Sequence, residues 1–432
     1  MRRRVRCAAG NRRPSAAMGG TSMSENKTAQ EARIADRGRY ADGRTRQIAV
    51  ADDDGTPLLI IEPITVGALE WQPADNSADS PIRLSRFAYL HRDGADMVLS
   101  TPRSRVTAVI RDERVAAFIA GLGVARRPTT LAALSRLSAE ACLRLADALR
   151  AVHLVTGAEP DCEEDDTIPQ TWEFHDLLLH ERSRRPKVGA INEPPRFGIV
   201  PEHQEPEWDL QAGELALPAV DLRAVAAADP PYGQVVLSRE SHRDYSGPEL
   251  ALKQLAVLLA RSLGPIERDA LPGTGTDIMW SRPYASAGAL FETDVVVIAH
   301  RVTGLAQGAY LYRPGAHALR PLEGDPASID GLLFDASQAT AAGIQRPQAL
   351  LVMAARFPDL AIKYDGIAYS LMLKNAGWIQ AAIQGAATAM GLGSVPIGTG
   401  DAVAFELATG LDRYRHGSTG EIAISVPRVQ PS

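Results

Sequence analysis

The sequence has 432 residues, of which 45% are hydrophobic and 23% charged, with a formal net charge of -6. This length predicts two or three folded units. The mild acidity excludes a broad electrostatic attraction to nucleic acid or to an anionic membrane, and no apolar run reaches the ~18 residues of a membrane-spanning helix. The scattered cysteines, Cys7, Cys142 and Cys162, predict neither a disulfide framework nor a zinc site, and we expect a cytoplasmic protein.

Residues 1–47 are rich in Arg, Ala, Gly and Ser and have almost no aliphatic side chains. Such a segment buries too little apolar surface to offset the entropy that it loses on ordering, which predicts a disordered basic tail. No apolar segment follows its arginines, so a secretory signal is not expected.

Residues 48–158 predict a small module of strands and helices. A β-hairpin is expected over residues 87–100, around the turn Asp93-Gly94, and helices are expected at 115–122, 130–137 and 138–155. This combination favours a winged-helix-like module. Because it lacks the dense basic face that phosphate contacts require, we expect it to dock a peptide or a partner protein, or to be purely structural.

Residues 159–232 are expected to form a linker and an extended connection. An acidic run, Glu163-Glu164-Asp165-Asp166, is typical of a solvated stretch, and residues 185–232 carry many prolines and little periodicity.

Residues 233–432 alternate predicted helices and strands. Helices are expected at 248–263 and 367–390, and apolar runs at 295–299, 350–354 and 422–426 predict strands. The whole chain is therefore expected to be an α+β protein. The helix at 367–390 carries small side chains that allow close helix approach, as at a buried dimer interface: Ala376, Gly377, Ala381, Ala382, Gly385 and Ala386.

Several common motifs are absent from the sequence. There is no G-x-G-x-x-G after a strand, no Walker A loop, no His-Glu-x-x-His and no G-x-S-x-G. His175 and His180 are five positions apart, which does not place both on one helical face, so no metal site is expected.

Three segments together suit a phosphate-bearing planar ligand. Residues 238–245 supply guanidinium and hydroxyl donors, residues 282–291 contain small residues that let backbone approach a flat ligand, and residues 391–400 are rich in glycine. Singly, each is better explained as a solvated loop, a tight turn or a helix C-cap with a following turn. Their occurrence together, in this order, favours a flavin site.

The order and wording of these segments resemble the nitroreductase superfamily, and specifically its SagB-type branch, the FMN-dependent azoline dehydrogenases. The resemblance covers residues 233–432 and extends upstream to residues 172–184, which are similar to a segment that often precedes the catalytic domain in that branch. It implies a C-terminal nitroreductase-like fold, a mixed sheet flanked by helices, and a homodimer with two FMN sites at the subunit interface.

By this resemblance, Arg239, Ser241 and Arg243 match the Arg-x-Ser-x-Arg contacts to FMN. Glu240 stands where Arg or His is common, which removes one possible phosphate contact. A C-terminal basic residue usually helps to hold the phosphate, and Arg428 is the candidate here.

A second match is the Pro-Ser-Ala-Gly-Ala-Leu-Tyr-Pro signature, a loop that in this family reaches the flavin from the other subunit. Ala285, Phe291 and Glu292 replace the Pro, Tyr and Pro of the signature, which leaves the path of the loop open. The matching positions are Ser286, Ala287, Gly288 and Leu290.

Two further segments complete the resemblance. Pro396, Ile397 and Gly398 match the Pro-Ile-Gly segment whose backbone lies against the flavin ring, and Lys363 and Tyr364 match the Lys-Tyr pair assigned to proton handling. Oxidation of an azoline removes a hydride, which flavin N5 accepts, and a ring-carbon proton, which needs a base. A desolvated pocket would help a lysine to act as that base. Without the resemblance, an exposed polar pair would be the plainer interpretation.

The expected function is therefore oxidation of thiazoline or oxazoline rings to thiazole or oxazole in a ribosomally synthesised, post-translationally modified peptide. A partner cyclodehydratase would first make the ring from Cys, Ser or Thr. Two alternatives stay open: an NAD(P)H-dependent nitro or quinone reductase on the same fold, and a non-catalytic peptide-binding scaffold with a degenerate flavin fold, which the departures at Glu240, Ala285 and Glu292 would fit.

Overall fold

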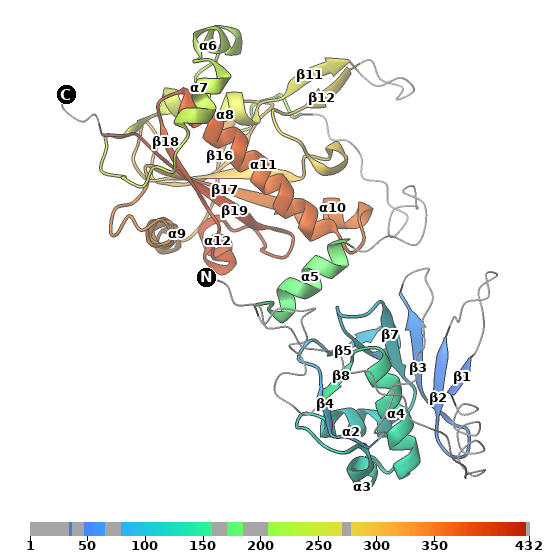
Figure 1. The fold of residues 1–432 in the computed structure, drawn as a ribbon. Coiled ribbons are helices and arrows are strands. Elements are labelled where there is room, and N and C mark those ends of the chain that lie inside the picture. The colour runs from blue at the N-terminus through green and yellow to red at the C-terminus, as the bar shows by residue number, and fades with distance from the viewer. Residues whose placement is uncertain are drawn as a thin grey trace, which may run out of the picture. The chain divides into compact units, whose positions relative to one another are not determined.

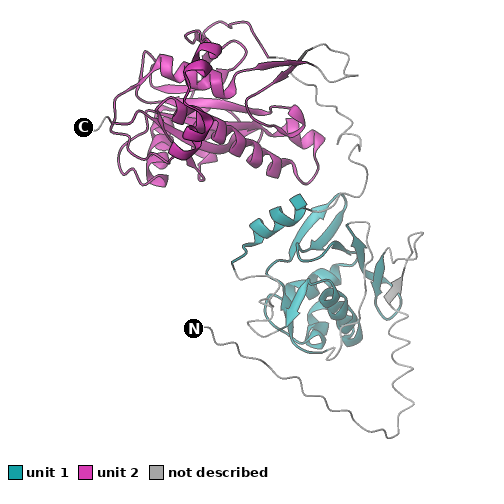
Figure 2. Ribbon diagram, turned by 45° about the horizontal axis from the view of Figure 1, so that its top comes forward, with its two compact units in different colours: residues 1–191 teal, residues 192–432 magenta. Residues whose placement is uncertain are grey.

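The computed structural model describes residues 34–36, 47–64, 79–157, 171–184, 206–269 and 278–428. The chain divides into two compact units, residues 1–191 and 192–432 (Figure 2). Most of the predicted disordered tail lies outside the described residues. The prediction is wrong for β1 (Ile34–Asp36), because this segment pairs with β2 (Ile48–Ala51).

Unit 1 is built on a six-stranded antiparallel sheet with the strand order β1-β2-β3-β7-β6-β5 (Figure 1). The predicted hairpin is confirmed, and it turns at Gly94, which has a φ of +58°. The sheet is wider than that hairpin, because it also includes strands that the sequence did not predict. The remaining strands of this unit are β3 (Pro57–Pro63), β4 (Ile82–Leu84), β5 (Tyr89–Asp93), β6 (Asp96–Ser100), β7 (Val106–Ile110) and β8 (Val155–Gly157).

Two helices, α2 (Glu113–Gly121) and α4 (Ala139–Ala151), pack on this sheet, and the short α3 (Ala132–Ser135), which follows the 3-10 turn η1 (Pro128–Leu131), packs against α2. The side chains of Asp112 and Ser138 accept backbone hydrogen bonds at the starts of α2 and α4, as N-caps do. α4 ends earlier than predicted, because His153 takes a left-handed φ of +58° and the chain then enters β8. Helices and strands share one core, so this module has its own hydrophobic interior.

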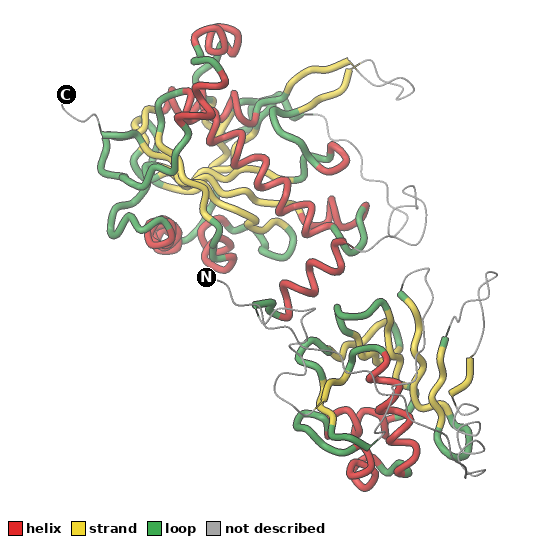
Figure 3. Tube along the Cα trace, viewed as in Figure 1, coloured by secondary structure: helices red, strands yellow, loops and turns green. Residues whose placement is uncertain are grey.

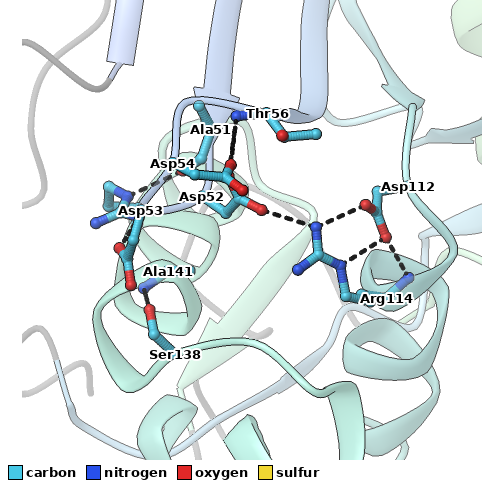
Figure 4. A network of polar contacts seen from close by, with 10 residues as sticks. Ala51, Asp52, Asp53, Asp54, Thr56, Asp112, Arg114, Ser138 and Ala141 are labelled. Carbon is cyan, nitrogen blue, oxygen red and sulfur yellow. Dashed lines mark hydrogen bonds and ion pairs between the residues drawn. The ribbon is translucent and has the colours of Figure 1, made fainter.

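A polar network ties the β2–β3 turn to these helices (Figure 4). The guanidinium of Arg114 donates to Asp52 at 2.7 Å and to Asp112 at 2.8 Å. Arg144, whose side chain is only 4% exposed, pairs with Asp53 at 2.8 Å. The acidic turn is thus held by α2 and α4 of the same unit.

Parts of the predicted linker, residues 159–232, form regular structure. Helix α5 (Phe174–Arg184) belongs to unit 1, where the Phe174 ring lies 5.6 Å from that of Tyr89. Residues 206–232 belong to unit 2, because β9 (Leu215–Ala216) pairs with a strand of its main sheet. The acidic run and residues 185–205 lie outside the described residues.

Unit 2 is built on a seven-stranded sheet with the strand order β18-β19-β17-β13-β15-β16-β9. Every neighbouring pair in it is antiparallel, and the parallel pairing expected of a mixed sheet is confined, among the described strands, to the two-residue ladder of β10 and β14. The strands of this unit besides β9 are β10 (Leu250–Ala251), β11 (Ile266–Asp269), β12 (Ile278–Ser281), β13 (Thr293–Ala299), β14 (Val302–Thr303), β15 (Gly308–Arg313), β16 (Ala318–Pro321), β17 (Ala349–Arg356), β18 (Gly393–Ile397) and β19 (His416–Ser425).

Helices cover both faces of this sheet (Figure 3). Alternate residues of a strand point to opposite faces, so Val295 and Val297 of β13 pack with α8 and α11, whereas Val296 and Ile298 pack with α9 and α12. None of the described helices is long and apolar enough to cross a membrane. The helices of unit 2 are α6 (Leu222–Ala228), α7 (Tyr232–Ser238), α8 (Leu252–Leu263), α9 (Pro326–Ala339), α10 (Phe357–Lys363), α11 (Ala368–Ala389) and α12 (Ala402–Thr409).

Candidate active site

Lys363 and Tyr364 stand at the C-terminal end of α10. Lys363 is the last residue of the helix, and Tyr364 caps it by donating its backbone N–H to the carbonyl of Leu360. The Lys363 side chain is exposed and Tyr364 is half-buried, with the Lys363 ammonium 5.6 Å from the centre of the Tyr364 ring. Both polar groups of the pair can therefore be reached from outside the unit.

The loop that carries the predicted signature lies directly against this pair within the same chain. Its 3-10 turn, η4 (Ala287–Ala289), contains Gly288 with a φ of +62°. A Cβ atom at Gly288 would lie 2.6 Å from Nζ of Lys363 and 2.8 Å from Oη of Tyr364. Glycine suits this position, because it tolerates the left-handed backbone and leaves room for the ends of both side chains.

A small apolar cluster packs against the residues of this contact. Ala287 and Leu290 of the loop pack with Tyr364 around the buried side chains of Leu360 and Met372. The signature loop, α10 and α11 therefore meet at one point within the same chain.

A buried polar network fixes the backbone of the loop. Glu292 is 0% exposed, and its carboxylate accepts hydrogen bonds from Nδ2 of Asn375 at 2.9 and 3.1 Å and from the Ser286 hydroxyl at 3.1 Å. Asn375 in turn accepts the backbone N–H of Ala287 at 3.3 Å. From the sequence, Glu292 is a departure from the signature and Asn375 is not singled out, although a polar residue among the apolar positions of α11 was the available signal. In the structure both residues hold the loop.

The predicted phosphate contacts lie on the segment after α7. Arg239 and Arg243 are exposed, Ser241 is half-buried, and Nη1 of Arg243 donates to the carbonyl of Ser241 at 3.2 Å. Neither arginine forms an ion pair with a carboxylate in the described part of the chain. The backbone N–H of His242 donates to the carbonyl of Ser394 at 3.1 Å and so fastens the segment to β18.

Arg428 lies beside the same segment. Hydrogen bonds from Ser246 lower the pKa of Asp244, and the nearby positive charge of Arg428 lowers it further. A Cβ atom at Gly247 would lie 3.3 Å from the backbone nitrogen of Arg428. The C-terminal candidate thus contributes a third cation to this end of the unit.

The Pro-Ile-Gly segment ends β18 and opens onto a pocket of about 360 Å³. Pro396, Ile397 and Gly398 line this pocket together with Arg243. A Cβ atom at Gly398 would meet no atom within 4 Å, so the backbone there faces open space. The structure therefore brings Arg243 and the Pro-Ile-Gly segment to one cavity.

A buried carboxyl that the sequence does not single out lies next to this cavity. Glu421 is 3% exposed and pairs across the sheet with Ile397, and its Oε1 has no hydrogen-bond partner among the described atoms. Burial raises the pKa of Glu421 to about 7, and the carboxylates of Asp335 and Asp401 add to this effect. All three carboxyls line an adjoining cavity of about 280 Å³. No cluster of metal-ligating side chains occurs within the described ranges.

The predicted site residues fall into two groups along the sheet. Strand β19 pairs with Arg356, next to α10, at its residue His416, and with Ile397 of the Pro-Ile-Gly segment at Glu421. These positions are five residues apart, or about 17 Å along a strand. One chain thus joins the Ser286–Leu290 loop to Lys363 and Tyr364, and Arg243 to the Pro-Ile-Gly segment, but does not bring both groups together.

Comparison with known families explains this arrangement of motifs. Residues 236–422 match the nitroreductase family, and residues 82–188 match the cyanobactin oxidase ThcOx family. The chain carries a nitroreductase-family domain. The superfamily and the α+β fold expected from the sequence are confirmed, and the cyanobactin oxidase segment ahead of the nitroreductase-family domain is consistent with the SagB-type branch.

Solved structures similar to the chain share little sequence with it. A putative nitroreductase from Ralstonia eutropha is 19% identical, covers 55% of this chain and 98% of its own, and has a TM-score of 0.38. A putative nitroreductase from Anabaena variabilis is 13% identical, with 87% and 84% covered and a TM-score of 0.41. The E. coli microcin synthetase McbBCD complex with truncated pro-MccB17 bound is 18% identical, with 51% and 78% covered and a TM-score of 0.35. No curated protein matches the sequence.

Proposed function

We propose that the protein is an FMN-dependent dehydrogenase that oxidises thiazoline or oxazoline rings to thiazole or oxazole in a ribosomally synthesised peptide. The observation that carries the proposal is the contact of Gly288 with Lys363 and Tyr364 inside a nitroreductase-family domain. The match of residues 82–188 to a family of cyanobactin oxidases supports a peptide substrate. We propose the cytoplasm as the location.

The residues of the arginine end fit FMN. Arg239, Arg243 and Arg428 supply positive charge without a described ion-pair partner, which suits a phosphate, and the pocket at Pro396–Gly398 offers open backbone for a flat ring. Bound there, FMN would supply the acceptor for a hydride. The residues of this chain would orient the flavin and exclude water from it.

A homodimer with shared FMN sites would unite the two groups of residues. The arginine segment of one subunit would face the Ser286–Leu290 loop, with Lys363 and Tyr364, of its partner. The outward face of α11 is in keeping with such a dimer, because Trp378 is 57% exposed on it. A large exposed aromatic side chain is common at an interaction surface.

Lys363 and Tyr364 would handle the ring-carbon proton. Loss of that proton and of a hydride turns the azoline into an aromatic azole, so the base must stand close to the ring carbon. The contact with Gly288 and the network of Glu292 and Asn375 would hold the pair in that place. Molecular oxygen would accept the two electrons from the reduced flavin and so return it to its oxidised form. A cyclodehydratase partner would supply the azoline-containing precursor peptide.

The first experiment is an absorption spectrum of the purified protein, with the released cofactor identified by mass. Bound FMN, followed by loss of two hydrogen atoms from an azoline-containing peptide, would support the proposal. Rapid reduction by NAD(P)H without azoline oxidation would identify a nitro or quinone reductase instead. Protein that stays colourless after reconstitution with FMN would contradict the proposal and favour a non-catalytic peptide-binding scaffold.

A further inference from the structure

A second and larger pocket opens in unit 2, on the other side of the signature loop. It has a volume of about 610 Å³. Its wall is rich in aromatic side chains, since Trp280, Tyr284, Phe291 and Tyr312 all line it. Tyr312 is 2% exposed, and charged side chains of both signs line the pocket beside these aromatic groups.

Most of the arginines in this wall are neutralised by carboxylates. Arg313 pairs with Glu214 at 2.8 Å and with Glu207 at 2.7 Å, and Arg320 pairs with Glu214 at 2.9 Å. Arg356 also lines the wall, and it pairs at 2.6 Å with Asp294 and at 2.8 Å with Asp359. These groups hold the wall together and leave no free charge for a ligand.

Arg282 is the exception. It forms no ion pair with any carboxylate that the structure describes. Its guanidinium donates to the Ser281 carbonyl at 3.4 Å, lies 5.6 Å from the centre of the Phe291 ring and hydrogen-bonds to Tyr284, while the more distant carboxylate of Asp294 adds a weaker attraction. Burial lowers the pKa of Arg282, in keeping with a charge set among aromatic groups. A partly desolvated cation without a paired carboxylate is costly, and a bound anion would offset that cost.

The pocket and the candidate catalytic pair share two structural elements. Phe291 lines the pocket, while Gly288 of the same loop touches Lys363. Arg356 and Asp359, at the start of α10, line the pocket, while Lys363 ends that helix. Seven helical residues span about 10 Å. An extended peptide covers that distance with about three residues.

We propose that this pocket binds a carboxylate of the peptide substrate, carried on a side chain about three residues from the ring that is oxidised. Arg282 would pair with the carboxylate through its planar fork of donors, and the aromatic wall would pack against the apolar part of the same side chain. The identity of the peptide rests on the proposed function, whereas recognition of a carboxylate beside Arg282 does not.

The first test measures binding of small probes to the full chain by calorimetry. Phenylacetate is expected to bind at least about tenfold more tightly than the neutral phenylacetamide, as one charge-assisted pair would give. Arg282→Gln should abolish that preference. Arg320→Gln is the matched control, because Arg320 lines the same pocket but is paired with Glu214, and it should keep the preference. Because neither FMN nor an azoline takes part, the outcome is independent of the proposed oxidation.

The second test compares peptides with Glu or Gln three residues from the azoline or from a Cys in its place. Tighter binding of the Glu peptide to the unaltered protein, lost in Arg282→Gln, would support the proposal in full. Discrimination between the small probes but not between the peptides would assign the pocket to a free carboxylic acid and overturn the peptide source. Equal binding of acid and amide in both tests, or a preference that survives Arg282→Gln, would overturn the proposal.

Discussion

Two buried glutamates lie beneath the two ends of the candidate site, and their surroundings differ. Glu292, under the signature loop, receives hydrogen bonds from Asn375 and Ser286. Glu421, beside the Pro-Ile-Gly segment, leaves one carboxyl oxygen without a partner among the described atoms. The first end is fixed by the chain itself, whereas the second keeps polar groups and cations that lack partners. We infer that the Lys363 end is organised for positioning, and the arginine end for binding.

The largest effect is expected from Lys363→Ala. Loss of a general base costs about a hundredfold or more in turnover, but this residue belongs to the positioning end, so bound FMN should remain. Turnover of an azoline peptide and flavin absorbance would be measured together. Lys253→Ala, which removes an exposed lysine of α8, is the control. Unchanged turnover in Lys363→Ala would remove this residue from the mechanism.

Glu421→Gln tests whether the unpartnered carboxyl is held in its neutral form. The pKa of Glu421 is raised from 4.5 to about 7 in the folded chain, so its contribution to stability is complete below about pH 4.5 and is lost as the pH rises to about 7. A shift of this size corresponds to about 3 kcal/mol at most. The variant should therefore lose less stability between pH 5 and pH 8 than the unaltered protein.

The measurement for Glu421→Gln is thermal unfolding at several pH values. Glu323→Gln, at an exposed position, should leave the pH profile unchanged. A profile in Glu421→Gln that parallels that of the unaltered protein would show that Glu421 is ionised throughout this range.

Gly288→Ala probes how closely the loop and the Lys-Tyr pair depend on each other. Its Cβ would lie 2.6 Å from the Lys363 ammonium, so the pair must shift, and we expect turnover to fall by between about tenfold and a hundredfold with FMN retained. Gly343→Ala introduces the same backbone strain at a φ of +68°, with no atom within 4 Å of the added carbon. If both variants lose activity equally, backbone strain rather than the contact is responsible.

Arg243→Gln should affect binding instead of turnover. Loss of one charge-assisted contact to a phosphate is expected to weaken FMN affinity about tenfold, measured by fluorescence quenching during titration. Arg346→Gln, which alters an arginine paired with Asp330 on the surface, should bind FMN normally. A reduced turnover at saturating FMN in Arg243→Gln would contradict the division between the two ends.

Local sequence signals predicted many elements of the fold. The hairpin of β5 and β6 follows from its alternation and its Asp93-Gly94 turn, and α11 follows from a long apolar period with bounds one residue inside those expected. The strands at 48–51 and 57–63 were not predicted, although they pair with each other across a short turn. The pairing of β3 with β7, which builds them into the sheet, joins residues about fifty apart, and no local pattern reports it.

The sequence predicted which residues belong to the candidate site, but not how they are arranged in space. The resemblance supplied Gly288, Lys363 and Tyr364, but their contact joins positions 75 apart in the chain and needs the folded packing of η4 against α10. The supporting pair of Glu292 and Asn375 is likewise far apart in the sequence. From the sequence alone Glu292 is only a departure from the signature, and the structure shows that it accepts a hydrogen bond from Asn375. A buried glutamate whose oxygens accept hydrogen bonds stabilises the loop, although the same residue departs from the sequence signature.

The short strand β9 has a practical consequence for dissecting the protein. It covers the outer edge of β16, and next to it the buried Glu214 neutralises Arg313 and Arg320. An excised catalytic domain that started at residue 233 would bare that edge, which then becomes a template for aggregation, and would strip a 6% exposed arginine of both its carboxylates. Cloning boundaries set at residue 206 or earlier would keep the recombinant domain soluble.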